Sequence, residues 1–162
     1  MRSRGGSGLP NDAELPSGVP VPFTATRRVL WGECDPSGFI YTPRALDYST
    51  ELIHAFCLAL TGQTDNENIR QGWGMPMVRV ECDYIKALIV DQEVVLTLTV
   101  ERLGGASVTY NIEAKGPDGT AYFRIRQIAC SITLDPVKSI PIPESLRTKI
   151  EAYQRACGSL AA

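Results

Sequence analysis

The stretch WGECDPSGFIYTPRALDYSTELIHAF, residues 31–56, decides the fold. From Pro43 to about Leu60 a helix is predicted, because proline is tolerated at the first helical position and Thr61-Gly62 stops the run. Thr42 is of a standard N-cap type. The helix is apolar on two opposite sides, and its only strongly polar strip consists of Asp47, Glu51 and His54. A helix of this kind is buried, so the rest of the chain has to wrap around it.

Strand signals dominate the sequence on both sides of this helix. Residues 24–33 are rich in β-branched and aromatic residues, and 63–74 form a polar loop. From Val78 to Tyr84 apolar and polar side chains then alternate strictly. Three further strands, joined by glycine-containing hairpin turns, are predicted at 94–100, 107–114 and 120–134. A short amphipathic helix is predicted at 144–156.

The order of these elements predicts an α+β fold. Hairpin connections make the sheet antiparallel, and a five-stranded antiparallel sheet around one long central helix, plus a short C-terminal helix, is the hotdog architecture. We expect one hotdog domain over 23–157, a flexible tail rich in Gly, Pro and Ser over 1–22, and a C-terminal tail over 158–162. Such a sheet leaves an exposed edge, which predicts pairing of two chains.

Composition excludes several classes of protein. With 162 residues, 44% of them hydrophobic, the chain can build one core, and its net charge of -2 does not favour nucleic acid or an anionic membrane as partner. No apolar run approaches the ~18 residues that span a bilayer, and 1–22 lacks the apolar core of a secretory signal. Five cysteines without a CxxC pair indicate reduced thiols in a cytoplasmic protein. With His54 as the single histidine, we expect neither a metal nor an organic cofactor.

From about Thr24 to Tyr153 the chain resembles the 4-hydroxybenzoyl-CoA thioesterase group of hotdog-fold acyl-CoA thioesterases. The resemblance lies in an acid, a glycine three residues later and an aromatic turn into the helix: Asp35-Pro-Ser-Gly38-Phe-Ile-Tyr41-Thr42-Pro43. It extends through Glu81-Cys-Asp-Tyr84, Val90-Asp-Gln-Glu93 and Ser107. It implies hydrolysis of an acyl- or aroyl-CoA by a homodimer with sites at its interface, doubled to a homotetramer. Many relatives have His or Tyr at the position of Thr42 and often Asn at that of Arg44, so a role for Thr42 rests on its backbone N–H.

The resemblance makes Asp35 the catalytic carboxylate. A helix start offers backbone N–H groups without intrahelical partners and roughly half a positive charge, which suits the oxyanion formed from a thioester carbonyl. Pro43 has no N–H, so Thr42 and Arg44 are the candidate donors, and Gly38 lets the turn approach the substrate. Asp35 can attack the carbonyl as a nucleophile or activate water as a general base, and the sequence leaves both open. The plainer alternative is that Asp35 only caps its own turn.

Other residues are candidates with structural alternatives. Glu51 is a second candidate carboxylate, or part of a solvated polar strip. Cys34 is a small buried residue rather than a nucleophile, because no base stands beside it in the sequence. Arg124 and Arg126, which share one face of a strand, either bind CoA phosphates together with residues such as Lys86 or form a basic surface. The aromatic residues that either line an acyl pocket or pack in the core are Trp31, Phe39, Tyr41 and Trp73.

Three rival functions stay open. The first is hydrolysis of acyl groups carried on a carrier protein, in polyketide or lipid biosynthesis. The second is non-catalytic binding of acyl-CoA, which the Asp35–Gly38 pair disfavours. A hotdog hydratase is disfavoured because such enzymes use an Asp/His pair, and His54 lies inside the helix.

Overall fold

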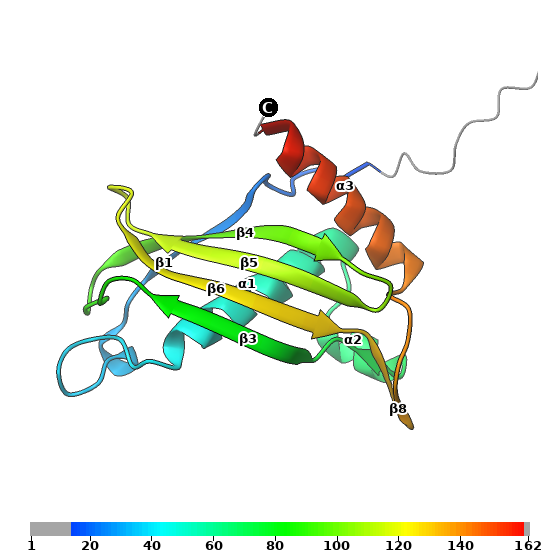
Figure 1. The fold of residues 1–162 in the computed structure, drawn as a ribbon, viewed down its shortest axis with the longest axis horizontal. Coiled ribbons are helices and arrows are strands. Elements are labelled where there is room, and N and C mark those ends of the chain that lie inside the picture. The colour runs from blue at the N-terminus through cyan, green and yellow to red at the C-terminus, as the bar shows by residue number, and fades with distance from the viewer. Residues whose placement is uncertain (1–13, 161–162) are drawn as a thin grey trace, which may run out of the picture.

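The computed structural model describes residues 14–160 and confirms the predicted α+β hotdog fold (Figure 1). A five-stranded antiparallel sheet, in the order β1-β4-β5-β6-β3, lies with one face against the long helix α1, Arg44–Thr61. The strands are β1 Phe23–Arg28, β3 Met77–Tyr84, β4 Glu93–Leu103, β5 Ser107–Lys115 and β6 Ala121–Cys130. Strands β1 and β3 are therefore the two edges of the sheet.

The core lies between α1 and the sheet. Phe56 of α1 is fully buried, and its ring packs edge-on against Phe23, Tyr110 and Tyr153, with centroids 5.5, 6.3 and 4.7 Å away. Such aromatic pairs add to the stabilisation from the apolar area they bury. The opposite face of α1 is exposed, including Ala55 and Leu58, so the prediction of a helix buried all round is wrong within one chain.

The start of α1 differs by one position from the prediction. Pro43 is the N-cap and no side chain caps the helix, so the predicted N-cap role of Thr42 is wrong. The reason is the preceding turn, in which the Arg44 N–H donates to the Tyr41 carbonyl at 2.8 Å and sets where helical geometry begins. The predicted end is confirmed, because Gly62 closes α1 in the left-handed conformation, with φ of 71°.

The segment predicted as a loop over 63–74 contains two elements. Helix α2, Asp65–Arg70, begins with a capping box in which the Thr64 hydroxyl accepts from the Glu67 N–H, and Glu67 bonds back to Thr64. Strand β2, Trp73–Gly74, pairs with β7, Ile132–Leu134, which pairs with β8, Val137–Ser139. The predicted strand over 120–134 therefore breaks at Ser131, where the chain leaves the main sheet for this small one.

The ends of the described chain pack against the core. Helix α3, Glu144–Leu160, runs past the predicted end at residue 156, and its Tyr153 hydroxyl donates to the Leu98 carbonyl at 2.6 Å. Near the N-terminus, Leu15, Val19 and Val21 pack against the core, whereas the tail segments 1–13 and 161–162 lie outside the described residues. The predicted strand over 24–33 ends at Arg28, and a short 3-10 helix, η1, Trp31–Glu33, follows.

Candidate active site at the start of α1

Asp35 lies in a tight turn between η1 and α1. The Gly38 N–H donates to the Asp35 carbonyl at 2.9 Å, and the Asp35 N–H donates to the Phe39 carbonyl at 2.8 Å. Gly38 has a φ of 82°, which a residue with a side chain adopts only with strain. This backbone conformation is the observed reason for a glycine at position 38, whereas its predicted role in close approach to the substrate stays a prediction.

The Asp35 carboxylate is held by Ser37. Its Oδ1 accepts from the Ser37 N–H at 2.8 Å and from the Ser37 hydroxyl, so Asp35 does cap its own turn. These hydrogen bonds hold the pKa of Asp35 below its usual value. The backbone of Phe39 lowers the pKa of this carboxylate as well, to a smaller extent. Ser37 therefore orients the Asp35 carboxylate and favours its ionised form.

Thr42, just before α1, has a backbone N–H without a hydrogen-bond partner within the described chain. Its carbonyl accepts from the Tyr84 hydroxyl at 2.6 Å. Thr42 and Asp35 both line a cavity of about 330 Å³, together with residues that include Phe39, Tyr84 and Lys86. The other predicted donor, the Arg44 N–H, is already bonded to Tyr41.

Tyr84 is a site residue to which sequence reasoning assigned no role. Burial, and then its hydrogen bond with Cys82, raise the pKa of Tyr84 to about 12, so it stays a neutral donor at physiological pH. Its hydroxyl joins the end of β3 to the start of α1, which are 42 residues apart in sequence. The one signal in the sequence that could have pointed to Tyr84 is its place in the motif Glu81-Cys-Asp-Tyr84. Its hydrogen bond to Thr42 could not be predicted, because it depends on the fold.

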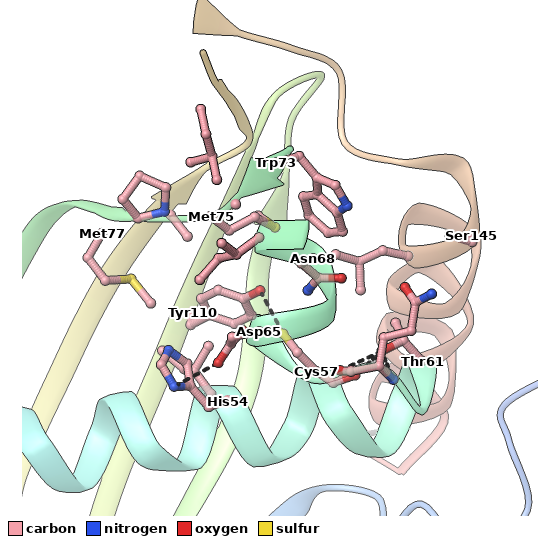
Figure 2. A pocket seen from close by; sticks show the side chains of 18 residues that line it. His54, Cys57, Thr61, Asp65, Asn68, Trp73, Met75, Met77, Tyr110 and Ser145 are labelled. Atoms are coloured by element: carbon pink, nitrogen blue, oxygen red, sulfur yellow. Dashed lines mark hydrogen bonds and ion pairs between the residues drawn. The ribbon is translucent and has the colours of Figure 1, made fainter. Parts of the chain in front are cut away.

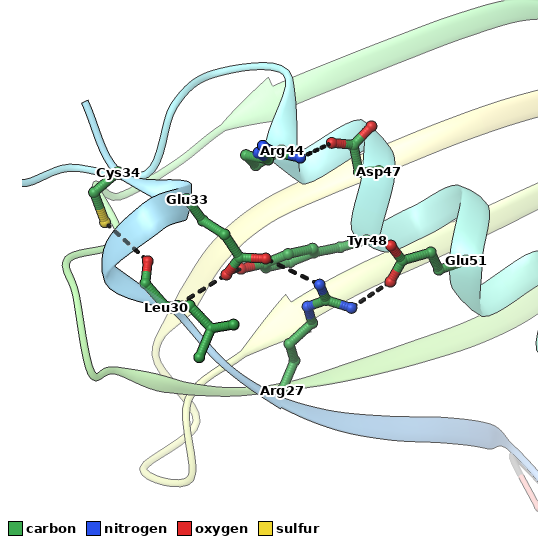
Figure 3. A network of polar contacts seen from close by, with 8 residues as sticks. All are labelled: Arg27, Leu30, Glu33, Cys34, Arg44, Asp47, Tyr48 and Glu51. Carbon is green, nitrogen blue, oxygen red and sulfur yellow. Dashed lines mark hydrogen bonds and ion pairs between the residues drawn. The ribbon is translucent and has the colours of Figure 1, made fainter.

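Glu33 ties the turn to the helix (Figure 3). Its carboxylate accepts from Arg27 at 2.9 Å, from the Leu30 N–H at 2.8 Å and from the Tyr48 hydroxyl. Its backbone carbonyl accepts from the Tyr41 N–H at 2.8 Å. Burial opposes ionisation of Glu33, but these donors outweigh it and hold the pKa of Glu33 below its usual value. Sequence reasoning missed this residue, which stands two positions before Asp35.

Arg27 and Glu51 complete this network. The Arg27 guanidinium bonds both Glu33 and Glu51 and lies 4.1 Å from the centre of the Tyr48 ring. Glu51 is exposed and paired with Arg27 (Figure 3), which matches the solvated-strip alternative better than a catalytic one. It does not line the cavity that holds Asp35 and Thr42.

The remaining predicted residues are spread over the molecule. Tyr41 is exposed beside Thr42, and Arg44 pairs with Asp47 at 2.9 Å at the helix start. Trp73 lines a different cavity, near the other end of α1 (Figure 2). Cys34 lies next to Asp35, and burial together with the nearby carboxylates raises its pKa, so the thiol stays protonated.

Arg124 and Arg126 point away from the Asp35 site. On β6 their buried neighbours Phe123 and Ile125 face α1, so the two arginines project from the opposite face of the sheet. Arg124 pairs with Glu113 at 3.1 Å, and Arg126 bonds Glu101 at 2.8 and 2.9 Å. Within one chain, these cations are partnered by carboxylates.

The described residues contain no group of three or more His, Cys, Asp or Glu side chains that could hold a metal ion. None of the helices within 14–160 is long and apolar enough to cross a membrane. The groups at this site include the Asp35 carboxylate and the backbone of Thr42, which line one cavity at the start of α1.

Comparison with known proteins gives the family. The model of the thioesterase-like superfamily matches residues 29–150, and the chain belongs to this superfamily. The match is at superfamily level and does not select the 4-hydroxybenzoyl-CoA group. No curated protein matches the chain significantly.

Solved structures agree on the fold. A Staphylococcus aureus protein solved in complex with CoA is 17% identical, with a TM-score of 0.79 over 86% of this chain and 89% of that one. A 1,4-dihydroxy-2-naphthoyl-CoA thioesterase from Synechocystis is 20% identical, with a TM-score of 0.73 over 79% of this chain and 94% of that one. A gentisyl-coenzyme A thioesterase is 22% identical, with a TM-score of 0.70 over 76% of this chain and 98% of that one.

Proposed function

We propose that the protein hydrolyses an acyl-CoA thioester to a free acid and coenzyme A. The observation that carries this proposal is the shared cavity of the Asp35 carboxylate and the unpaired Thr42 N–H at the start of α1. A thioester carbonyl oxygen placed at the Thr42 N–H gains a hydrogen bond and the favourable end of the helix dipole as negative charge develops. One such donor is worth about 2.7–4 kcal/mol in other enzymes.

Asp35 then acts in one of two ways. As a nucleophile, its oxygen adds to the carbonyl carbon, the C–S bond breaks, CoA leaves as the thiolate, and water hydrolyses the resulting mixed anhydride. As a general base, it takes a proton from a water molecule whose oxygen adds to the same carbon, and the C–S bond then breaks with CoA leaving as the thiolate. Both routes need the ionised carboxylate, and the hydrogen bonds from Ser37 favour that form.

The comparisons support CoA as the carrier of the acyl group. One structural neighbour was solved with CoA, and two others are named as thioesterases of aroyl-CoA substrates. These names motivate an aroyl-CoA, as in the 4-hydroxybenzoyl-CoA group, as the first substrate to test. The five free cysteines are consistent with a cytoplasmic location, which is also part of this proposal.

We further propose a homodimer that forms through β3. On this edge strand Val80 and Tyr84, opposite the buried Gln127 and Phe123 on the α1 side of the sheet, are 41 and 48% exposed. If two β3 strands pair antiparallel with Val80 opposite Val80, Arg79 of one copy lies opposite Glu81 of the other. A pair centred on Arg79 or on Glu81 would instead place two like charges opposite each other. The predicted tetramer would join two such dimers.

Free thiol release from a panel of acyl-CoAs tests the function, with wild type compared with Asp35→Asn. The panel contains short, long, branched and aromatic acyl groups. We expect rapid turnover of one class and a loss of ~10²-fold or more in Asp35→Asn, the size of a central catalytic group.

A matched control is Asp118→Asn. Asp118 also caps a Pro/Gly turn, accepting from the N–H and the hydroxyl of Thr120 at 3.0 and 2.8 Å, but lies in the hairpin between β5 and β6. An equal loss of activity in both variants would show that Asp35→Asn acts through the loss of a turn cap and not through the loss of a catalytic group. If wild type hydrolyses only acyl groups on a carrier protein, or merely binds acyl-CoA, the corresponding rival function replaces this one.

A further inference from the structure

Asp35 lines a second cavity besides the one that it shares with Thr42. This cavity has a volume of about 430 Å³ and is formed by η1, the turn that contains Asp35 and the loop before β4. Its lining consists of Trp31, Cys34, Asp35, Pro36, Gly38 and Val90, and we call it the Trp31 cavity. Within residues 14–160, Asp35 is the one residue that lines both cavities. A carbonyl carbon at Asp35 therefore lies where the two cavities meet, and the acyl and thiol parts of a thioester can each enter one of them.

Trp31 contributes an exposed apolar surface to its cavity. Its side chain is 84% exposed, more than any other large apolar side chain in the described chain. Trp31 therefore does not pack in the core, which is one of the two roles predicted for it. An indole ring in water is stabilised when an apolar chain covers it. A ligand in the Trp31 cavity can supply this cover.

Backbone hydrogen bonds fix the walls of the Trp31 cavity. The Cys34 N–H donates to the Trp31 carbonyl at 3.2 Å and closes η1. In the loop before β4, the Asp91 N–H donates to the Val29 carbonyl at 2.9 Å, and Asp91 has a φ of 66°, which residues with a side chain rarely adopt. Walls that are already ordered lower the entropy cost of binding. The cavity is therefore preformed in the ligand-free chain.

The lining of the Trp31 cavity disfavours phosphate groups. None of the described residues that line it is a lysine or arginine, and the ionised Asp35 brings a negative charge, which repels phosphate. A neutral chain fits these walls. The neutral part of CoA next to the sulfur is the pantetheine arm, which consists mainly of methylene and amide groups. With the sulfur at Asp35, an extended arm is about as long as four residues, roughly 14 Å, and carries the phosphates beyond the cavity.

The pantetheine arm also matches the cavity in size and polarity. A volume of about 430 Å³ holds roughly fourteen groups of the size of a water molecule, at about 30 Å³ each, and the arm has about eleven non-hydrogen atoms from the sulfur to its second amide. The amides need hydrogen bonds, which water can provide on the open side of Trp31. An acyl group without polar atoms instead gains most where it is fully enclosed. The Trp31 cavity therefore favours the thiol part of the substrate over the acyl part.

We propose that the Trp31 cavity binds the pantetheine arm of the thioester and that the Trp31 ring packs against this arm. The inference rests on the proposed function and adds which part of the substrate Trp31 recognises. Trp31 contributes to affinity for the thiol, whatever acyl group it carries.

Three thioesters of one acyl group test this assignment, with CoA, pantetheine and methanethiol as the thiol. Their hydrolysis is compared between wild type and Trp31→Ala. We expect Trp31→Ala to lower kcat/KM by the same factor for the CoA and pantetheine thioesters, roughly tenfold, as for the loss of one aromatic contact. The methyl thioester has no arm, so its kcat/KM should not change.

Leu30→Ala is the matched control for Trp31→Ala. Leu30 is 58% exposed beside Trp31 but does not line the cavity, so this variant should retain kcat/KM with all three thioesters. An equal loss with all three thioesters in Trp31→Ala, or no loss with the CoA thioester, would overturn the proposal while the thioesterase function stands. A wild type that hydrolyses none of the three would contradict the proposed function instead, and binding then decides about the cavity.

The fluorescence of Trp31 reports on the cavity without turnover. The chain has two tryptophans, so Trp73→Phe leaves Trp31 as the single reporter. S-methyl CoA, S-methyl pantetheine, the adenosine bisphosphate part of CoA and benzoic acid are titrated into this variant. We expect the emission of Trp31 to move to shorter wavelength with the first two ligands only, because the arm removes water from the indole. A shift with benzoic acid alone, or none with S-methyl CoA at concentrations that saturate the protein in calorimetry, would contradict the assigned occupant.

Discussion

At the scale of the residue, Glu33 joins the segment that precedes Asp35 to both β1 and α1. Its carboxylate reaches β1 through Arg27 and α1 through Tyr48, and its carbonyl holds the Tyr41 N–H beside Thr42. Asp35 stands two residues further along the same backbone. Glu33 therefore acts on the reaction only by positioning other groups. We expect its substitution to have a smaller effect on activity than substitution of Asp35.

Glu33→Gln should lower kcat by about tenfold, with KM changed by less than about twofold. The amide retains the shape of Glu33 but weakens hydrogen bonds that are worth about 1.5–3 kcal/mol when one partner is charged. Steady-state kinetics and a thermal melt on the same sample make the measurement. Glu113→Gln, which loses ion pairs on the outer face of the sheet, is the control and should keep its kcat.

Ser37→Ala should move the acid limb of the pH profile of kcat/KM to higher pH. The Ser37 hydroxyl bonds the ionised form of Asp35, and this bond is the main reason that the pKa of Asp35 is lowered. Loss of the hydroxyl favours the protonated, inactive form, so the pKa rises and activity is lost at a higher pH as the solution is acidified. The shift should be smaller than one from removal of both bonds, because the Ser37 N–H remains. An unchanged limb would show that another group controls it.

At the scale of the element, α2 forms one wall of the cavity that Trp73 lines, although it has only six residues. A helix this short does not form by itself, so it depends on its cap and on packing. Thr64→Ala removes the capping box and should cost about 1 kcal/mol of local stability. Hydrogen exchange of residues 65–70 should become faster while α1 stays protected. Thr24→Ala, at an exposed position on β1, should leave the exchange of α2 unchanged.

At the scale of the whole molecule, we expect the exposed edge strand β3 to decide whether the chain is a monomer or a dimer. Val80→Asp sets two carboxylates opposite each other at the proposed twofold axis, so we expect a monomer in light scattering after size exclusion. The monomer should be folded by circular dichroism but should lose most activity, because the family resemblance implies an active site at the dimer interface. Val137→Asp, at a position 70% exposed on β8, should remain a dimer and active. A fully active Val80→Asp monomer would exclude a shared site.

Much of the fold could be predicted because it depends on local patterns. The alternation from Val78 to Tyr84, the proline and glycine that bound α1, and the glycines of the hairpin turns each specify an element from a few adjacent residues. The predicted loop over 63–74 was wrong although its capping box was readable, because two short elements have too few residues to show a period.

The sequence by itself determined the order of the five main strands and the two long helices. It also determined the turn of Asp35 and Gly38, since hydrogen bonds between near neighbours build that turn. Only the tertiary structure decided which donor stays free at Thr42, that Tyr84 and Glu33 hold the helix start, and that Arg124 and Arg126 face away from it. These features join residues that are distant in the chain, such as Tyr84 and Thr42. Their contacts exist only after the sheet has closed over α1, and no pattern within a short window of sequence encodes them.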